Sequence, residues 1–236
     1  MKKISLFLVF IFSIVLACTQ NYKNKADNSG NIETKCEKYA YFGDTKICLP
    51  EIDGMTECYS NPNVKKRSDR IFLSNQKVLI LASYIPNEIY KKIDILDEIS
   101  FSEYFIIYGY EYTKNVKIGI KDLNEANQAA KDAFGKIELN FNFDKTWNID
   151  DILMNFGKPV LLENYVPNNN TRTFVLLMYM KADNKEFIML SLIDMMLVKE
   201  NLIILNYFYT YDGKESIAKA KSKNNNVILR FLEENN

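Results

Sequence analysis

One carboxylate stands out because of its apolar surroundings. Asp194 lies inside the run FIMLSLIDMMLV, where a charged group must be paired, be protonated or point to an edge or a cleft. A buried partner such as a lysine or a tyrosine hydroxyl is the ordinary outcome, whereas an acid with a perturbed pKa in a cleft is a functional one. We expect the ordinary outcome. Asp194 and Glu111 are nevertheless the residues on which a carboxylate enzyme would have to depend.

The other acidic groupings are weaker candidates for acid-base chemistry or for a divalent cation. Asp150-Asp151 and the group Asp94, Asp97 and Glu98 fall at expected helix ends and faces, where carboxylates favour the helix N-terminus or face water. Neither has the spacing of a calcium loop. Phosphate-binding glycine loops, paired Cys-x-x-Cys ligands and nucleophile-elbow motifs are also missing from the sequence.

Composition narrows the function further. The 236 residues include no histidine, which excludes Ser-His-Asp triads, Cys-His pairs and histidine-bearing zinc sites. Thirty basic and thirty acidic residues cancel, so the charge balance gives no reason to expect a nucleic-acid partner. The sequence therefore predicts a protein with no catalytic residues, no cofactor and no metal, which acts by binding.

The beginning of the sequence predicts export. Lys2 and Lys3 precede an apolar run over residues 4–16, and Ala17 follows, which is the order of a signal peptide and is too short for a membrane-spanning helix. The segment Val15-Leu16-Ala17-Cys18 resembles the bacterial lipoprotein cleavage box, although Leu16 stands where that box more often has a small or β-branched residue. The resemblance implies cleavage before Cys18 and acylation of its sulfur. The alternative is a plain signal peptide cut elsewhere, with Cys18 incidental.

The expected lipid anchor defines three segments of the chain. Residues 1–17 form the signal peptide, residues 18–37 form the lipidated cysteine and a tether poor in large apolar side chains, and residues 38–236 form one globular domain. The acyl chains would hold this domain to a lipid bilayer in the bacterial cell envelope. Thr19, rather than an aspartate, follows the cysteine, which under enteric sorting favours the outer membrane over the inner one.

The three further cysteines are candidates for a disulfide. With Cys18 acylated, an odd number remains, so one disulfide is expected outside the cytoplasm. Cys48 with Cys58 is the preferred pair, and Cys36 with Cys58 or with Cys48 is also allowed.

The region 51–70 looks like a long irregular connection and is the expected binding loop. Its basic residues are the candidate partner contacts: Lys65, Lys66, Arg67 and Arg70.

Hydrophobic periodicity predicts an α+β domain. Strands are expected at 39–42, 45–49, 77–85, 160–166, 172–180, 186–198 and 201–211, and helices at 86–98, 122–134, 149–156 and from about 212 to the C-terminus. Residues 100–112 fit a helix or a strand; on an exposed strand their tyrosines would form a contact patch. The later strands are apolar on both alternations, so we expect an antiparallel sheet covered by helices on both faces, a three-layer α/β/α sandwich.

Part of this order of strands and helices resembles the PsbP-like fold. That fold includes extrinsic photosystem proteins, a nuclear Ran-binding protein and bacterial lipoproteins. The matching features are the step Ile47-Cys48-Leu49-Pro50, Gly54-Met55, the strand at 78–82 and a final hairpin that leads through Asp212-Gly213 into a helix ending in Leu229-Arg230-Phe231. The match is weakest over 98–170. The resemblance implies the same three-layer sandwich and an adaptor or accessory role.

We therefore expect a lipid-anchored, non-catalytic binding or accessory protein with an envelope protein partner. Two alternatives stay open. One is an immunity lipoprotein that neutralises a toxin delivered to the envelope. The other is an enzyme that uses carboxylates without histidine. Carboxylates that converge in a pocket would favour the enzyme, whereas a shallow apolar or aromatic patch would favour binding.

Overall fold

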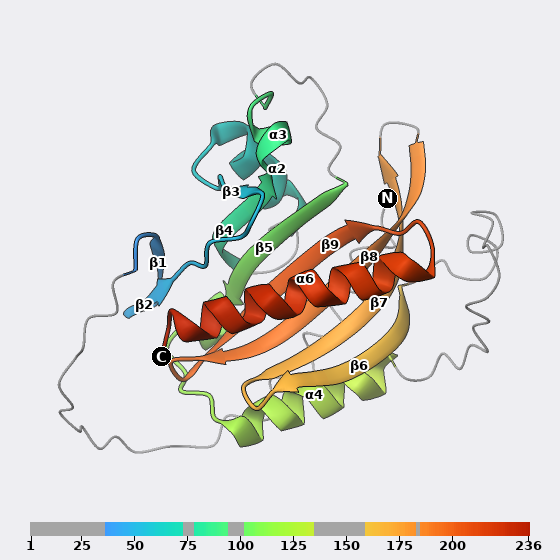
Figure 1. Ribbon diagram of the computed structural model, residues 1–236. Helices are drawn as coiled ribbons and strands as arrows, with labels where there is room; N and C mark the ends of the chain where they lie inside the picture. Colours follow the sequence, from blue (N-terminus) through green and yellow to red (C-terminus); the bar gives the residue numbers. More distant parts are fainter. Residues whose placement is uncertain (1–35, 73–77, 94–101, 135–158, 183–184) are drawn as a thin grey trace.

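The computed structural model describes residues 36–72, 78–93, 102–134, 159–182 and 185–236 (Figure 1). The expected signal peptide, Cys18, most of the tether and the acidic groups at 94–98 and 150–151 lie outside these residues, as does the expected helix 149–156. Within them, no helix is long and apolar enough to cross a membrane.

A seven-stranded antiparallel sheet makes up most of the described chain, with strand order β3-β4-β5-β9-β8-β7-β6. A separate hairpin pairs β1 with β2. The strands are β1 (Tyr39–Phe42), β2 (Thr45–Cys48), β3 (Met55–Glu57), β4 (Val78–Pro86), β5 (Glu103–Tyr110), β6 (Val160–Asn168), β7 (Thr171–Ala182), β8 (Lys185–Val198) and β9 (Asn201–Thr210).

The meander predicted for residues 160–211 is confirmed, because β6, β7, β8 and β9 pair in sequence order. The region 100–112, which fitted a helix or a strand, forms β5 and pairs with β9. Stacked rings support this pairing: Phe105 lies over Tyr207 with a centroid separation of 3.9 Å. Both residues are buried, so the aromatic density of this region serves the core.

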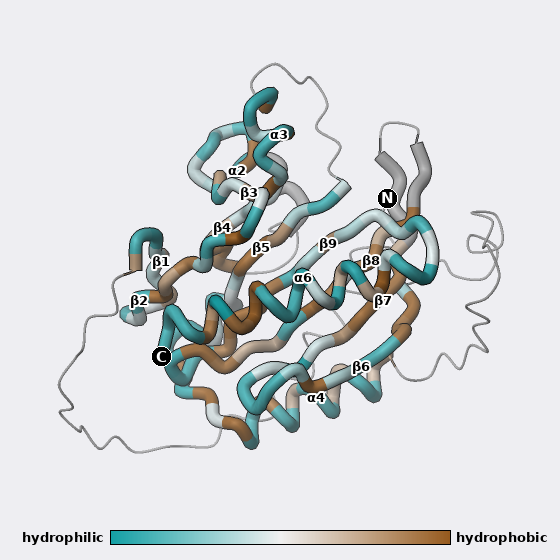
Figure 2. The backbone as a smooth tube through the Cα atoms, viewed as in Figure 1, coloured by the Kyte–Doolittle hydropathy of each residue, from teal (hydrophilic) through white to brown (hydrophobic). Residues whose placement is uncertain are grey.

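The three-layer α/β/α sandwich is wrong. The described residues hold four α-helices, α2 (Pro62–Phe72), α3 (Asn87–Tyr90), α4 (Ile120–Phe134) and α6 (Lys214–Glu233), and these do not form a helical layer on each face. One face is covered by the single helix α6 together with the β1–β2 hairpin, and the other by α4 over β6–β8 and by the shorter α2 beside β4 (Figures 1 and 2).

The physical reason lies in two segments. Over the described part of the expected helix at 86–98, only the four residues of α3 are helical, because Pro86 belongs to β4 and a turn follows Tyr90; residues 94–98 lie outside the described ranges. The segment 100–112 adds a strand instead of a helix. Strand apolarity alone indicated that both faces are covered, but it did not indicate that a hairpin and aromatic side chains share that role with helices.

Polar clamps hold α6 in its place. The Asn235 side chain, just beyond the helix, accepts a hydrogen bond from the Cys48 amide and donates one to the Cys48 carbonyl, each at 2.9 Å. It also donates to the Phe231 carbonyl at 2.8 Å. Within α6, Arg230 forms a bidentate pair with Asp53 at 2.8 and 2.9 Å. The C-terminal end of the chain is therefore fastened to β2 and to the loop before β3.

Candidate functional site

Asp194 is fully buried on β8, under α6. Thr173 lies directly opposite it on β7, and its hydroxyl donates to Asp194 Oδ1 at 2.6 Å. From α6, Asn224 Nδ2 donates to the two carboxyl oxygens at 3.0 and 2.9 Å. Asn224 thus supplies a hydrogen-bond donor to the buried acid, and Asp194 has its ordinary structural partners, although neither is a lysine or a tyrosine.

Burial raises the pKa of Asp194 from 3.8 to about 7, while the hydrogen bonds from Thr173 and Asn224 act in the opposite direction. Desolvation dominates because the carboxylate loses water on all sides and receives only amide and hydroxyl donors in return. A carboxyl with no exposed surface does not reach a substrate. Its position between two strands and a helix instead makes it a polar link between layers.

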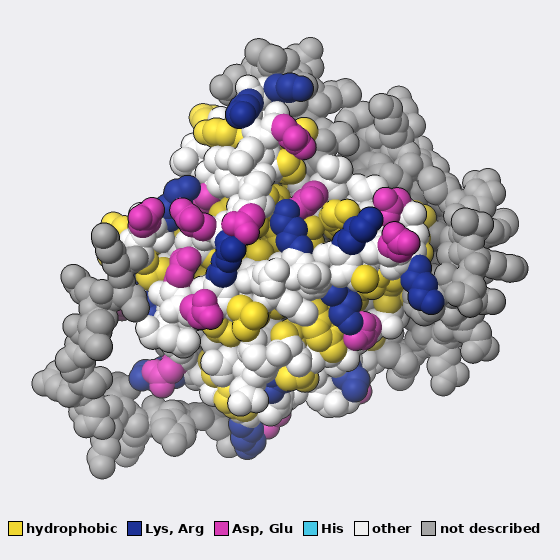
Figure 3. Space-filling view, viewed as in Figure 1, with side chains coloured by type: hydrophobic (Ala, Val, Ile, Leu, Met, Phe, Trp, Pro, Cys, Tyr) yellow, Lys and Arg dark blue, Asp and Glu magenta, His cyan; other side chains and the backbone are white. Residues whose placement is uncertain are grey.

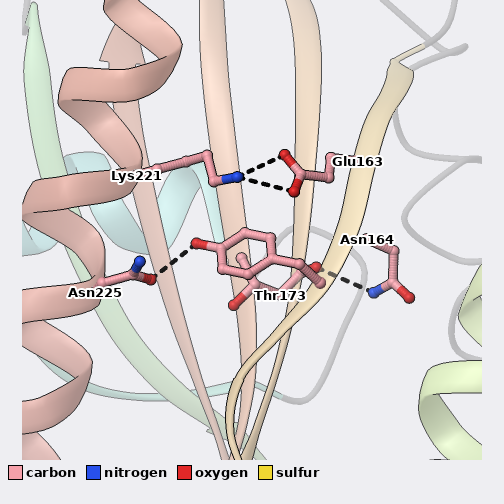
Figure 4. A network of polar contacts seen from close by, with 6 residues as sticks. Glu163, Asn164, Thr173, Lys221 and Asn225 are labelled. Carbon is pink, nitrogen blue, oxygen red and sulfur yellow. Dashed lines mark hydrogen bonds and ion pairs between the residues drawn. The ribbon is translucent and has the colours of Figure 1, made fainter.

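A second set of contacts joins β6 to α6 near Thr173 (Figure 4). Lys221 of α6 and Glu163 of β6 point toward one another, and Lys221 Nζ lies 2.8 and 2.7 Å from the two carboxylate oxygens. The Tyr165 hydroxyl donates to Asn225 at 2.9 Å, and the Lys221 ammonium lies 4.4 Å from the Tyr165 ring centroid. These contacts fasten α6 to the edge strand β6.

Side chains alternate between the two faces along β6, so Asn164, which follows Glu163, lies on the opposite face from Lys221. Asn164 donates to the Thr173 carbonyl and to Asn127 of α4, each at 3.0 Å. On that face Arg172, which is 8% exposed, is satisfied by Asn124 and by carbonyls of the β6–β7 turn. Polar side chains of β6 and β7 therefore attach a helix to each face, and no carboxylates converge among them.

The remaining acidic candidate is separate from this cluster. Glu111 lies in a short 3-10 turn, Glu111–Thr113, and forms an ion pair with Lys114 at 3.8 Å. A shallow hollow beside α6 is lined by mixed groups: Asp53, Ala218, Lys219, Ser222, Lys223 and Asn226. On this side of the molecule, basic and acidic side chains are interspersed (Figure 3). Within the described ranges, no three acidic or cysteine side chains gather as a metal site would require.

The expected irregular binding loop at 51–70 is corrected by the structure. This region contains β3 and most of α2, so the basic run lies on a helix. Lys65 pairs with Asp69 at 2.6 Å and contacts the Tyr59 hydroxyl at 3.2 Å. Lys66 is exposed, and the side chains of Arg67 and Arg70 lie outside the described part. The spacing of Lys65 and Asp69 is the ordinary stabilising pair of a helix surface.

The three described cysteines are free thiols. The preferred Cys48–Cys58 disulfide is thus not formed in the structure. Both residues are buried, and burial is the main cause that raises the pKa of Cys48 to about 11 and that of Cys58 to about 12. Cys58 Sγ donates to the Ser83 carbonyl at 3.3 Å.

An exposed aromatic pair on β1 is the feature that sequence reasoning missed. Tyr39 and Tyr41 are 50% and 61% exposed, and their rings meet edge to face with centroids 5.7 Å apart. Lys46 Nζ lies 4.5 Å from the Tyr39 ring centroid. On the opposite side of the strand, Phe42 packs into the core against Gly109. The alternation in the sequence YAYF was the signal that contained this arrangement.

The tyrosine patch expected within 104–112 is mostly core. Tyr104 and Tyr108 are 8% and 4% exposed, and Tyr104 stacks on Phe208 at 4.4 Å. Tyr112 is 36% exposed and stacks on Tyr110 at 5.4 Å. The exposed aromatic pair therefore lies on the β1–β2 hairpin, whereas the tyrosines of β5 are mostly buried.

Comparison with known proteins gives little. No protein-family model matches the chain, and none of the curated proteins matches it. Among solved structures, the chain is similar to the Ran-binding protein Mog1p of Saccharomyces cerevisiae, with a TM-score of 0.34 and 12% identity, over 80% of this chain and 86% of that chain. A similarity this distant assigns no function.

Proposed function

We propose that this protein is a lipid-anchored binding protein of the bacterial cell envelope, which is held to the bilayer through acylated Cys18 and acts without catalysis. The observation that carries the binding role is the exposed pair Tyr39 and Tyr41. The anchor is supported by the signal-like segment that precedes Cys18.

The aromatic pair has the properties of a contact surface for another protein. Tyrosine rings present a large area at a small cost in side-chain entropy, and they are enriched at protein interfaces. Here β1 holds them on a strand whose other side is fixed by buried Phe42. Lys46 beside the Tyr39 ring adds a cation–π contact and a polar rim.

The contacts of the two candidate acidic residues support the non-catalytic role. Asp194, the acid best suited to a perturbed pKa, is enclosed by Thr173 and Asn224. Glu111 is engaged with Lys114 in a different part of the chain. Asp194 therefore links two strands and a helix, and Glu111 takes part in a local ion pair beside one turn.

Site-specific crosslinking tests this role. A photo-crosslinking phenylalanine analogue at Tyr41, in the full chain expressed in bacteria, should capture one envelope protein in stoichiometric amount. The matched control carries the analogue at Tyr90, which is 38% exposed on α3, and should not capture it. Competition by added Cys18→Ser protein should abolish the adduct.

Two results would contradict the proposal. One is the same set of adducts from Tyr41 and Tyr90, which would indicate random collision. The other is the absence of any protein adduct at Tyr41 when the protein is in the membrane fraction. If the captured protein is a toxin, the binding role is the specific one of an immunity lipoprotein.

A further inference from the structure

The β1–β2 hairpin brings the beginning of the described chain to the end of β2. Cys48 is the last residue of β2 and lies opposite Tyr39. One step further, the Leu49 amide donates to the Lys38 carbonyl at 2.8 Å. Cys36 precedes Lys38 by two residues, so it lies close in sequence to the pairing that follows the end of β2.

The side chains of Cys36 and Cys48 interact where the hairpin strands meet. Burial, and after it the Cys36 side chain, raise the pKa of the Cys48 thiol. Cys36 is partly exposed, so an oxidant in solution can reach its sulfur. The Cys48 backbone is fixed on both sides by Asn235. One thiol is thus accessible and the other is held in place, which is the arrangement that favours exchange through a mixed disulfide.

Cys58 is placed differently. Its sulfur donates to the Ser83 carbonyl at 3.3 Å and packs in the core cluster that contains Val64 of α2. Cys48 instead lies on β2 of the separate hairpin, and its backbone bonds to Asn235 beyond α6, whereas the Cys58 amide donates to the Ser83 carbonyl of β4 at 2.8 Å. The two cysteines preferred as a pair from the sequence are therefore held by different elements.

We propose that Cys36 and Cys48 form an intramolecular disulfide, while Cys58 stays a thiol. The reaction is exchange with an oxidised dithiol carrier or with oxidised glutathione. The Cys36 thiolate attacks a sulfur of the oxidant and releases one thiol. Cys48, after losing its proton, then attacks the Cys36 sulfur and releases the second. Two protons and two electrons leave the protein, one S–S bond forms, and the oxidant is reduced to two thiols.

This bond would close a ring over residues 36–48, and the ring contains the exposed Tyr39 and Tyr41. It would also fasten the point where the expected tether joins the domain to β2 and, through Asn235, to the end of α6. An oxidising compartment is supplied by the proposed export, but the hairpin that brings the two cysteines into one region does not depend on it. The test is therefore carried out with purified protein.

Purified full chain carrying Cys18→Ser, which keeps three cysteines, is incubated with oxidised glutathione, denatured, alkylated and cut with a glutamate-specific protease. Cuts after Glu37, Glu51 and Glu57 separate the three cysteines onto different peptides. We expect one linked pair, residues 34–37 with residues 38–51, and one alkylated thiol at Cys58. The matched control Cys58→Ser should keep the link, whereas Cys36→Ser should lose it.

A stability measurement separates a formed native bond from one made only in denatured chains. The closed ring should raise the thermal midpoint of the oxidised protein by ~5 °C or more over its reduced form. Cys36→Ser should show no such shift. A link to Cys58, or three alkylated thiols after oxidation, would overturn the proposal. Failure of membrane anchoring would overturn the proposed function but would leave this bond intact.

Discussion

The region beneath α6 and the β1–β2 hairpin use polar and aromatic side chains in opposite ways. Beneath α6, Asp194, Thr173 and Asn224 are fully buried and bond to one another. On the hairpin, Tyr39 and Tyr41 are exposed, their rings contact each other, and Lys46 lies over the Tyr39 ring. The first region has contacts that specify the position of a helix, and the second presents side chains that the described residues leave largely exposed.

The comparison shows why an unusual residue in the sequence is a poor guide to a site. Asp194 is unusual because apolar residues surround it, and that same burial removes it from any substrate. Tyr39 and Tyr41 look ordinary in the sequence, yet the sheet leaves them on the surface. A functional assignment therefore requires knowledge of which groups remain unsatisfied after folding.

The largest expected effect is the pH dependence of stability caused by Asp194. Its pKa is about 7 in the folded protein and 3.8 in the reference state, so folding is favoured at low pH, where both states are protonated. Between about pH 4 and pH 7 only the unfolded chain loses the proton, and the free energy of unfolding falls by up to about 4 kcal/mol. The loss is complete above pH 7.

Denaturant titrations from pH 4.5 to pH 8 on the wild type and on Asp194→Asn measure this contribution. The variant removes the titrating group, so the difference in unfolding free energy between the two proteins should change with pH over that range. Parallel curves would show that Asp194 keeps an ordinary pKa and that it is solvated in the folded state.

Asn235→Ala should have the next largest effect. The substitution removes three hydrogen bonds and leaves the buried backbone groups of Cys48 without partners, which costs about 3 kcal/mol. Asn236→Ala is the control, because that residue is exposed and should change the free energy by less than about 0.5 kcal/mol. Equal midpoints in urea for the two variants would refute the clamp on α6.

Thr173→Val should cost about 2 kcal/mol at pH 8, because the hydroxyl bonds to an ionised carboxylate there. Loss of that donor should also raise the pKa of Asp194 further. Thr171→Val is the matched control: its buried hydroxyl has no hydrogen-bond partner within the described residues, so the substitution should be neutral or stabilising. Denaturant unfolding at pH 8 compares them, and an equal loss in both would contradict the assigned bond.

The smallest effect on stability should come from the double substitution Tyr39→Ser and Tyr41→Ser. Exposed rings contribute little to the core, so the thermal midpoint should shift by less than about 3 °C. Capture of the envelope partner by the full chain should fall at least tenfold. A large loss of stability with unchanged capture would assign these residues to the fold rather than to binding.

Local hydrophobic patterns explain which strands and helices were predicted correctly. The strands 160–211 were predicted because long apolar runs alternate with polar turns, and α4 because its apolar stripe has a helical period. The final helix was also predicted despite its three asparagines. Asn224 is accommodated there because Asp194 accepts its hydrogen bonds, a contact between residues thirty positions apart.

Long-range packing accounts for what the sequence did not predict. The position of β5 beside β9, the hairpin that covers part of one face and the separation of Cys48 from Cys58 all depend on contacts between distant segments. The turn-rich segment between Cys48 and Cys58 favoured that pair in the sequence. It gave no information on which elements would hold each cysteine after folding.

The most direct test of the proposed anchored role is the acylation state of residue 18. Bacteria expressing the full chain or Cys18→Ser are fed an alkyne-tagged fatty acid, fractionated and analysed by intact mass. We predict that the wild type begins at Cys18, carries acyl chains and is found in the membrane fraction, while the variant is unlabelled and released. An unlabelled wild type, or a variant that stays equally bound to the membrane without any acyl group, would contradict the proposal.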